Sequence, residues 1–211
     1  MNKENLKGKF SGRFIVLDGP DGCGKSTHSR LLIEWLKEQG ISVAGFRDPG
    51  NTDIGEKIRE VLLNPEHKAM DTRTELLLYM AARAQLWAEK IAPALETKQC
   101  VVMDRWLSST CAYQGYAGGF GMENVIKIAT DCLERVWPDM TIILDVDLKT
   151  ASGRLNSELD RMEQKGDGYH QKVRKGFLEL AKENENFLVV DASGEVETVN
   201  KNILNHISED F

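Results

Sequence analysis

The sequence lacks the features that mark secreted, membrane-bound or zinc-binding proteins. Its four cysteines show no C-x-x-C pair and no metal-ligand spacing, so reduced thiols in a cytosolic protein are the simplest account of them. No apolar run approaches the ~20 residues that a membrane helix needs. The N-terminal stretch MNKENLKGKFSGR carries charge but no apolar signal-peptide core. We therefore expect a soluble, cytoplasmic protein that does not bind a membrane.

An excess of basic charge is absent as well. The formal net charge of −6 argues against a general nucleic-acid binder, although a local basic cluster could still hold one phosphorylated metabolite. The chain shows no internal repeat, no low-complexity tract and no linker rich in proline or serine. We therefore expect one domain, residues 1–211, around a single buried core.

What the chain does contain is an alternation of short apolar runs and longer helical patterns. Runs of this kind predict strands that are buried on both faces of a sheet. Five are expected, at Phe14–Asp18, Val43–Asp48, Cys100–Arg105, Thr141–Val146 and Phe187–Ala192. Their order predicts an α/β fold with a five-stranded, mostly parallel sheet flanked by helices. Because ligands bind at the carboxyl ends of such strands, the polar residues that end four of them should meet at one rim.

The stretch GPDGCGKST has the G-x-x-x-x-G-K-S spacing of a phosphate-binding loop, and it lies between an expected strand and an expected helix. Glycines let successive backbone N–H groups point inward, and the helix N-terminus adds a positive dipole end. Lys25 would reach the β- and γ-phosphates, and the Ser26 hydroxyl would ligate Mg²⁺. We predict a nucleoside triphosphate site formed by Gly19, Pro20, Asp21, Gly22, Cys23, Gly24, Lys25, Ser26 and Thr27.

This loop does not identify the acceptor of the phosphate. The sequence has no N-K-x-D motif of a GTPase, and a motor or helicase would be expected to be larger. Arg47 and Arg105 each follow an expected strand on the same rim, and a planar guanidinium suits a phosphate bidentately. Each arginine could instead form a structural salt bridge. Two of them together favour a second phosphate site.

The segment TRTELLLYMAARAQ adds a candidate site for a nucleobase. Tyr79 and Arg83 are four residues apart and therefore share a face of the expected helix. An arginine in so apolar a stretch is costly without a partner. An aromatic ring for stacking and an arginine for an exocyclic carbonyl would fit a nucleobase, whereas a tyrosine such as Tyr79, taken alone, more often fills the core.

The stretch LNSELDRMEQKGDG, residues 155–168, is polar, charged and poor in apolar periodicity. On composition alone it predicts a solvated loop or a frayed helix. A loop of this length in a compact domain is often functional, so a mobile lid is the other interpretation.

Taken in order, these motifs resemble the thymidylate kinase family along essentially the whole chain. GPDGCGKST resembles its P-loop, RDPGNT its R-E-P-G-G-T motif and YMAARAQ its base-binding helix. DRWLSSTCAYQG is similar to its D-R-Y-x-x-S-x-x-A-Y-Q-G block, and LDRMEQ to its D-R-x-E lid. The resemblance implies a P-loop NTPase fold with a lid at about residues 155–168, ATP as phosphoryl donor with Mg²⁺, dTMP as acceptor, and a homodimer without a nucleic-acid partner.

The resemblance also implies roles for individual residues. On the acceptor, these are Asp21 at the 3′-hydroxyl, Arg47 and Arg105 at the phosphate, Tyr79 stacked on the base, Arg83 and Gln114 reading the base, and Tyr113 under the deoxyribose. Asp104 would join Ser26 near Mg²⁺. Arg154 and Arg161 match the lid arginines, with Arg154 also on ATP. The implied catalytic set is Lys25, Arg105, Arg154 and Arg161.

Four positions depart from the family pattern. Asp48 replaces a glutamate, Asn51 replaces the second glycine of R-E-P-G-G-T, and Trp106 replaces the tyrosine of D-R-Y. Gly22 stands where some members carry a P-loop arginine, so we expect the lid to supply the catalytic positive charge. Asn156 and Ser157 lie where lid-basic members often add arginines.

The implied reaction is phosphorylation of dTMP to dTDP in dTTP synthesis. A phosphate monoester has a second pKa of about 6 and is largely dianionic at neutral pH, so no general base is required. Catalysis would rest on positioning and charge stabilisation. Two other classes stay open on the sequence: a different nucleotide or deoxynucleoside kinase on the same scaffold, and a non-enzymatic nucleotide-dependent switch.

Overall fold

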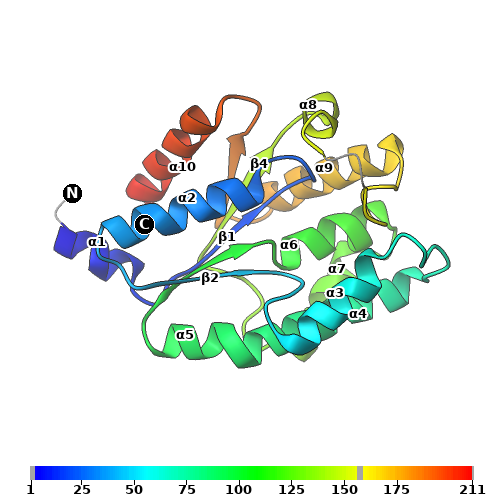
Figure 1. Cartoon of the computed structure of the whole chain (residues 1–211), viewed down its shortest axis with the longest axis horizontal. Coiled ribbons are helices and arrows are strands. Elements are labelled where there is room, and N and C mark those ends of the chain that lie inside the picture. The colour runs from blue at the N-terminus through cyan, green and yellow to red at the C-terminus, as the bar shows by residue number, and fades with distance from the viewer. Residues whose placement is uncertain (1–2, 156–158, 211) are drawn as a thin grey trace.

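A parallel five-stranded sheet in the order β2-β3-β1-β4-β5 forms the centre of the computed structural model, which describes residues 3–155 and 159–210 (Figure 1). The strands are β1 Phe14–Asp18, β2 Val43–Arg47, β3 Cys100–Asp104, β4 Met140–Asp145 and β5 Phe187–Asp191. Each agrees with a predicted run to within one residue, and every pairing is parallel. The predicted fold class is confirmed.

Helices cover both faces of this sheet. They are α1 Lys3–Phe10, α2 Lys25–Glu38, α3 Asp53–Leu63, α4 Thr72–Leu86, α5 Ala92–Glu96, α6 Leu107–Thr110, α7 Met122–Cys132, α8 Leu148–Ser152, α9 Asp167–Lys182 and α10 Val196–Asp210, with π-helical segments η1 Trp87–Ile91 and η2 Cys111–Ala117. Helices α1, α2 and α10 pack on one face, and α4, α5, α7 and α9 supply the core on the other.

The central strand β1 shows why these runs are apolar without interruption. Successive side chains of a strand point to opposite faces. Ile15 and Leu17 pack with Leu32 of α2, whereas Phe14 and Val16 belong to the cluster on the opposite face. All four are fully buried. A strand covered by helices on both faces has no position for a polar side chain until it reaches its end.

The carboxyl ends of β1, β2 and β3 meet at one rim, as predicted. In the sheet register, Leu17 pairs with Asp104, and Asp104 pairs in turn with Arg47. The P-loop leaves β1 here, and the Asp-Arg motif leaves β3 beside it. The chain therefore places its phosphate-binding and acceptor motifs side by side.

Two further expectations concern the chain as a whole. The four cysteines are free thiols. Within the described ranges, no helix is long and apolar enough to cross a membrane. That residues 1–211 form one domain stays a prediction.

The predicted lid, residues 155–168, is described in part. Residues 156–158, which include Asn156 and Ser157, lie outside the described residues. From residue 159 the chain forms turns and then enters α9 at Asp167.

These turns are organised by one carboxylate. Asp160 Oδ1 accepts hydrogen bonds from the backbone N–H groups of Met162, at 2.7 Å, and Glu163, at 2.9 Å. Glu163 Oε2 accepts in return from the Asp160 N–H at 2.9 Å. The Arg161 N–H donates to Leu63 O at 3.1 Å, which joins the turn to the end of α3. The described part of the predicted lid is thus joined to the C-terminal end of α3.

Candidate active site

The loop between β1 and α2 takes its shape from three glycines with positive φ. The φ angles are 139° at Gly19, 78° at Gly22 and 93° at Gly24, a region that side-chain-bearing residues rarely adopt. At Gly22 an added Cβ would collide with the carbonyl group of Ala151, next to the end of α8. The loop therefore has no room at this position for the arginine that the family pattern allows in the sequence analysis.

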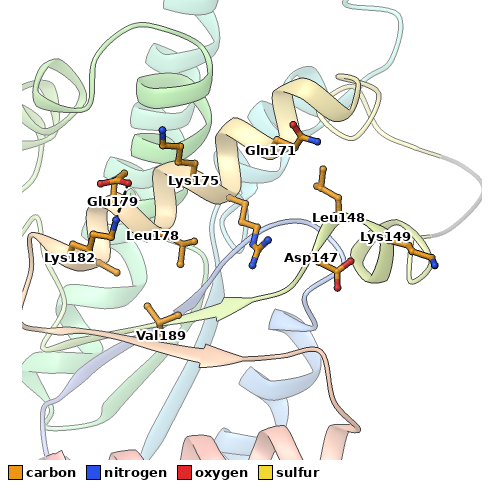
Figure 2. A pocket seen from close by; sticks show the side chains of 11 residues that line it. Asp147, Leu148, Lys149, Gln171, Lys175, Leu178, Glu179, Lys182 and Val189 are labelled. Atoms are coloured by element: carbon orange, nitrogen blue, oxygen red, sulfur yellow. Dashed lines mark hydrogen bonds and ion pairs between the residues drawn. The ribbon is translucent and has the colours of Figure 1, made fainter.

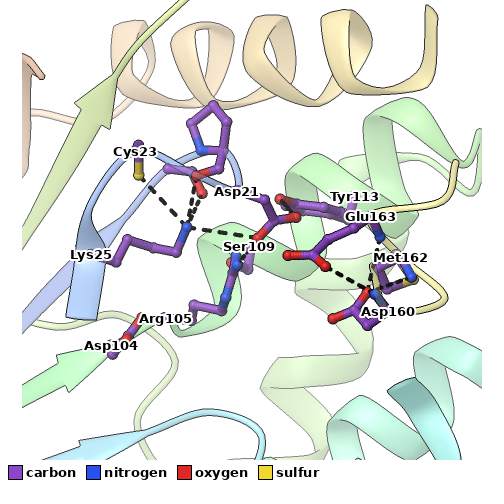
Figure 3. A network of polar contacts seen from close by, with 12 residues as sticks. Asp21, Cys23, Lys25, Asp104, Arg105, Ser109, Tyr113, Asp160, Met162 and Glu163 are labelled. Atoms are coloured by element: carbon purple, nitrogen blue, oxygen red, sulfur yellow. Dashed lines mark hydrogen bonds and ion pairs between the residues drawn. The ribbon is translucent and has the colours of Figure 1, made fainter. Parts of the chain in front are cut away.

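Lys25, the first residue of α2, turns its ammonium group back into the loop (Figure 3). Nζ donates to Gly19 O at 3.0 Å and to Pro20 O at 2.7 Å, and it lies 3.9 Å from Asp21 Oδ1. The side chain is almost fully buried. A fixed positive charge is thus held inside the cradle that the sequence assigns to a triphosphate.

Arg105, directly after β3, binds the same aspartate (Figure 3). Its Nη2 donates to Asp21 Oδ1, and Tyr113 Oη donates to Asp21 Oδ2 at 2.7 Å. Burial alone would raise the pKa of Asp21, but the charges of Arg105 and Lys25 bring that pKa below its ordinary value. A carboxylate between two cations stays ionised. The loop and Arg105 consequently form one electrostatic unit.

Asp18, at the end of β1, supports both halves of this unit. The residue is fully buried. Its Oδ1 accepts from Ser109 Oγ at 2.6 Å and from the Gly19 N–H at 2.9 Å. Ser109 also accepts from Arg105 Nη1 at 3.2 Å. Sequence reasoning gave Asp18 no role, although an acid at the end of an apolar strand was a usable signal.

Ser26 and Asp104 form the candidate magnesium site. Ser26 Oγ, at the start of α2, donates to Asp104 Oδ2, at the end of β3, at 2.5 Å. Mg²⁺ prefers oxygen ligands and commonly takes one or two from protein and the rest from phosphates and waters. A hydroxyl and a carboxylate suit it. No cluster of three His, Cys, Asp or Glu side chains suited to a metal occurs in the described residues.

A pocket beside the P-loop brings together most residues predicted to bind the acceptor. Its lining includes Asp21, Tyr79, Arg83, Arg105, Tyr113 and Gln114. They come from the P-loop, α4, the end of β3 and η2. Four segments that are distant in sequence therefore build one cavity, and we refer to it as the acceptor pocket.

Arg83 has the partner that its apolar surroundings require. It is 1% exposed, and its Nε donates to Asp48 Oδ2 at 2.6 Å. Nη2 donates to Thr110 Oγ1 at 2.9 Å. Burial raises the pKa of Asp48 above its ordinary value, while Arg83 opposes that rise. Oδ1 of Asp48 is buried and has no hydrogen-bond partner in the described part of the chain. Asp48 thus acts as the support that fixes the Arg83 guanidinium.

Arg47 does not line this pocket. Its Nη2 donates to Glu56 Oε2 at 2.8 Å and Oε1 at 3.0 Å, and its side chain is 47% exposed. It borders a separate cavity with Ser26 and Asp104. The role of Arg47 on the acceptor phosphate stays a prediction that this arrangement does not support.

Arg59 of α3 lines the acceptor pocket instead. Its Nη1 donates to Pro49 O at 3.1 Å, and the side chain is partly buried. Burial lowers its pKa from the ordinary arginine value, which leaves it charged at neutral pH. Sequence reasoning missed Arg59, because it belongs to an ordinary amphipathic helix and to none of the recognised motifs.

The two predicted lid arginines lie in different places. Arg154, just after α8, donates from Nη1 to Ala192 O at 2.9 Å and from Nη2 to Ser193 O at 3.1 Å. It borders a cavity together with Gly24 and Thr27 of the P-loop. That position is compatible with the predicted contact between Arg154 and ATP.

Arg161 lies on the acceptor side. Its side chain is buried, with Nη1 donating to Glu75 Oε2 at 2.5 Å and Nε to Leu62 O at 2.7 Å. The ion pair holds the guanidinium at the start of α4. This arrangement does not support the prediction that both lid arginines act on the transferred phosphate, and it favours Arg154 for the donor side.

A cavity of about 830 Å³ lies elsewhere, between α8, α9 and β5 (Figure 2). Lysine and acidic side chains both line this cavity. Arg174, which also lines it, is paired with Asp145 through two hydrogen bonds of 2.7 Å. None of the predicted site residues borders it. It therefore takes no part in the candidate chemistry.

Comparison with known proteins gives a consistent assignment. The sequence profile of the family described as Thymidylate kinase matches residues 17–203. A thymidylate kinase of Caldanaerobacter subterraneus subsp. tengcongensis is 41% identical over 200 residues, 94% of this chain and 96% of that protein. A thymidylate kinase of Bacillus licheniformis is 41% identical over 205 residues, 95% of this chain and 97% of that protein.

Solved structures agree with the sequence comparison. The crystal structure of a thymidylate kinase from Ehrlichia chaffeensis has a TM-score of 0.77 and 30% sequence identity, and covers 94% of this chain and 99% of that one. The profile match includes the P-loop, the acceptor pocket and the described part of the lid. The chain belongs to the thymidylate kinase family.

Proposed function

We propose that this protein transfers the γ-phosphoryl group of ATP to dTMP, giving dTDP and ADP, as a step of dTTP synthesis. One observation carries the proposal: Asp21 lies 3.9 Å from Lys25 in the P-loop and also lines the acceptor pocket with its partner Arg105. The triphosphate loop and a second anion site therefore share a wall. Two arginines of that pocket, Arg59 and Arg105, suit the phosphate of a nucleoside monophosphate.

The reaction requires that two anions be held together. An oxygen of the dTMP phosphate attacks the γ-phosphorus, and the bond from that phosphorus to the β–γ bridging oxygen breaks, leaving ADP. Lys25 and Arg105 offset the charge on the donor and acceptor respectively. The acceptor phosphate is already largely dianionic at neutral pH, so no side chain has to remove a proton. Positioning and charge stabilisation carry the catalysis.

Magnesium fits the donor side. Ser26 Oγ and the Asp104 carboxylate are hard oxygen donors, 2.5 Å apart, at the mouth of the P-loop. When bound there with the nucleotide, the ion would neutralise phosphate charge. We propose that Ser26 and Asp104 hold it.

Base selection follows from two polar side chains that line the acceptor pocket. Arg83 offers N–H donors, and Gln114 offers an amide, on two neighbouring elements, α4 and η2. Thymine presents an acceptor at O4 and a donor at N3. A site with a donor and an acceptor at these places binds thymine and leaves polar groups unpaired with cytosine. Tyr79, whose pKa burial raises, stays neutral and suits stacking.

A deoxynucleoside kinase is the alternative on this scaffold, and it would need a carboxylate base at the acceptor hydroxyl. The three carboxylates that line the pocket are all engaged, and Asp160 accepts hydrogen bonds from the N–H groups of Met162 and Glu163. Asp21 binds Arg105, which helps hold its pKa low and makes it a weak base, and Asp48 binds Arg83. A pocket that also holds Arg59 favours a phosphorylated acceptor.

A single assay tests these assignments. ADP release is measured with ATP, Mg²⁺ and a panel of nucleosides and nucleoside monophosphates. The proposal expects turnover with dTMP far above that with thymidine, dCMP or dGMP. Faster turnover with thymidine would support the nucleoside kinase, and acceptor-independent hydrolysis would support a nucleotide switch.

We also propose a homodimer that acts in the cytoplasm. The family resemblance supports the dimer. Helices α3 and α4 lie side by side (Figure 1), and they carry three exposed apolar side chains, Ile54, Val61 and Leu77, which also support it. The free cysteines suit a reducing compartment. Analytical ultracentrifugation of the wild type and of Leu77→Lys tests the dimer; a wild-type monomer would refute it.

A further inference from the structure

Glu75 is a buried carboxylate for which the predicted mechanism has no use. It lies in the first turn of α4 and is 2% exposed. Its Oε1 accepts from Gln114 Nε2 at 2.7 Å, and its Oε2 accepts from Arg161 Nη1 at 2.5 Å. Lys165 Nζ lies 3.2 Å from both oxygens. Two separate segments thus converge on this acid of α4: η2 and the turn after residue 159.

This acid is ionised. Burial alone would raise the pKa of Glu75, but Lys165, Gln114 and Arg161 together hold it below the ordinary value. An ionised carboxylate has only acceptor sites and no proton to donate. Any group that hydrogen-bonds to Glu75 must therefore do so through an N–H or O–H.

That restriction decides how the Gln114 side chain is turned. A carboxamide has a donating end and an accepting end, and hydrogen bonding to neighbours determines which end faces which way. With Nε2 committed to Glu75, Oε1 is the atom that Gln114 can offer to a ligand in the acceptor pocket, which it lines. The reversed amide would place two acceptor oxygens against each other in a buried site, which is costly.

An acceptor at this position distinguishes pyrimidines by their N3 atom. Thymine carries a hydrogen at N3 and can donate to Oε1 of Gln114. Cytosine has an unprotonated N3, which would face that oxygen as a second acceptor. Arg83, on the neighbouring helix, is a donor throughout and suits a carbonyl rather than an amino group.

We propose that Glu75 is a positioning residue that sets base specificity: it holds the Gln114 amide with its oxygen toward the acceptor pocket, and so selects keto pyrimidines, which donate at N3. The inference rests on the proposed phosphorylation of dTMP. Through Arg161 and Lys165 the same carboxylate also anchors the turn whose Asp160 and Met162 form part of the pocket wall. Base reading and the position of that wall consequently depend on one charge.

The test is Glu75→Gln in the full-length protein. A glutamine at this position can donate or accept, so it no longer dictates the orientation of the Gln114 amide. We expect the ratio of kcat/KM for dTMP to that for dCMP to fall roughly ten-fold or more, with the KM for ATP unchanged. Where dCMP turnover is too slow to measure, its inhibition constant against dTMP replaces it.

The chain offers a matched control. Gln85 Nε2 donates to Glu89 Oε2 at 3.1 Å, an amide–carboxylate pair that is exposed and lies outside the pocket. Glu89→Gln removes the same charge from the same kind of pair and should keep the wild-type ratio. In Arg161→Gln, Lys165 still faces Glu75 and keeps it ionised, so the ratio should stay unchanged. Binding of dTMP should weaken, because the turn loses one of its anchors.

Folding is checked by thermal unfolding of each variant. If Glu75→Gln does not fold, Glu75→Asp replaces it: the shorter acid keeps its charge but withdraws from Gln114, and the ratio should still fall. An unchanged ratio in either folded variant would overturn the proposal, as would the failure of both to fold, which would make Glu75 a stability residue. A wild type inactive on dTMP would instead refute the proposed function.

Discussion

The P-loop and the acceptor pocket lie side by side, yet they are built in different ways. The P-loop is a contiguous stretch whose shape comes from glycine φ angles and whose lysine is held by the loop's own carbonyl groups. The acceptor pocket consists of side chains from distant segments, fixed by buried ion pairs such as Arg83 with Asp48. A site made of backbone needs little outside support. A site made of charged side chains depends on a second set of residues behind it.

The largest effect is expected on the donor side. Lys25→Ala removes a cation aimed at the charge that develops during transfer, so kcat should fall by on the order of 10²–10³. Because the loop is shaped by backbone, the melting temperature should change little. Steady-state kinetics with ATP and dTMP, together with thermal unfolding, check both parts. Wild-type turnover in this variant would refute the P-loop assignment.

On the acceptor side, stability and activity should be lost together. Arg83→Met leaves the Asp48 carboxylate buried and unpaired, which typically costs about 3–5 kcal/mol of unfolding free energy. The kcat/KM for dTMP should fall by roughly 10² while the KM for ATP changes little, since a donor to the base is lost.

Replacing both partners separates those two losses. A variant with Arg83→Met and Asp48→Leu has no unpaired buried charge, so it should recover much of the stability. It should remain poor with dTMP. Recovery of dTMP turnover in the double variant would mean that Arg83 is structural and does not read the base.

A smaller effect is expected for the sugar. Tyr113 is 4% exposed, and its hydroxyl donates to Asp21 at 2.7 Å. If its ring fills the space of a 2′-hydroxyl, Tyr113→Ala should reduce the preference for dTMP over its ribose counterpart by about 1–3 kcal/mol. Tyr113→Phe keeps the bulk and should keep the preference. The test is to measure kcat/KM for dTMP and for its ribose counterpart in the wild type, Tyr113→Ala and Tyr113→Phe. An unchanged preference in the alanine variant would assign Tyr113 to the core.

The smallest effect should come from Arg161, for which the structure revises the expectation from sequence. Removal of a lid arginine on the transferred phosphate would lower kcat. Arg161 instead binds Glu75 and Leu62 O, so Arg161→Ala should mainly raise the KM for dTMP. The stability loss should be below the ~3–5 kcal/mol of a broken buried pair, because Lys165 still faces Glu75. A fall in kcat alone would return Arg161 to the donor side.

The sequence predicted the strands and the P-loop well, because both follow from local patterns. An apolar run of five residues and a glycine spacing each carry their structure within a short window. The place of Arg59 in the pocket does not follow from a local pattern. Arg59 has no motif around it, and its position depends on how α3 packs against α4.

Ion pairing was the other limit on prediction from sequence. The pattern showed that Arg47 and Arg161 had the right chemistry for phosphate, but it could not show that Glu56 and Glu75 bind them. Those pairs join residues nine and eighty-six positions apart. For Arg83, the apolar surroundings in the sequence predicted that the side chain has a partner. The structure was needed only to identify that partner as Asp48.

The contact between Gly22 and α8 constrains how this enzyme could evolve. Because any side chain at this position would strike the carbonyl group of Ala151, a glycine-to-arginine change here would be deleterious on its own. We therefore expect a side chain at position 22 to be accepted only together with a shift of α8, so the position of this short helix limits which substitutions the loop can take.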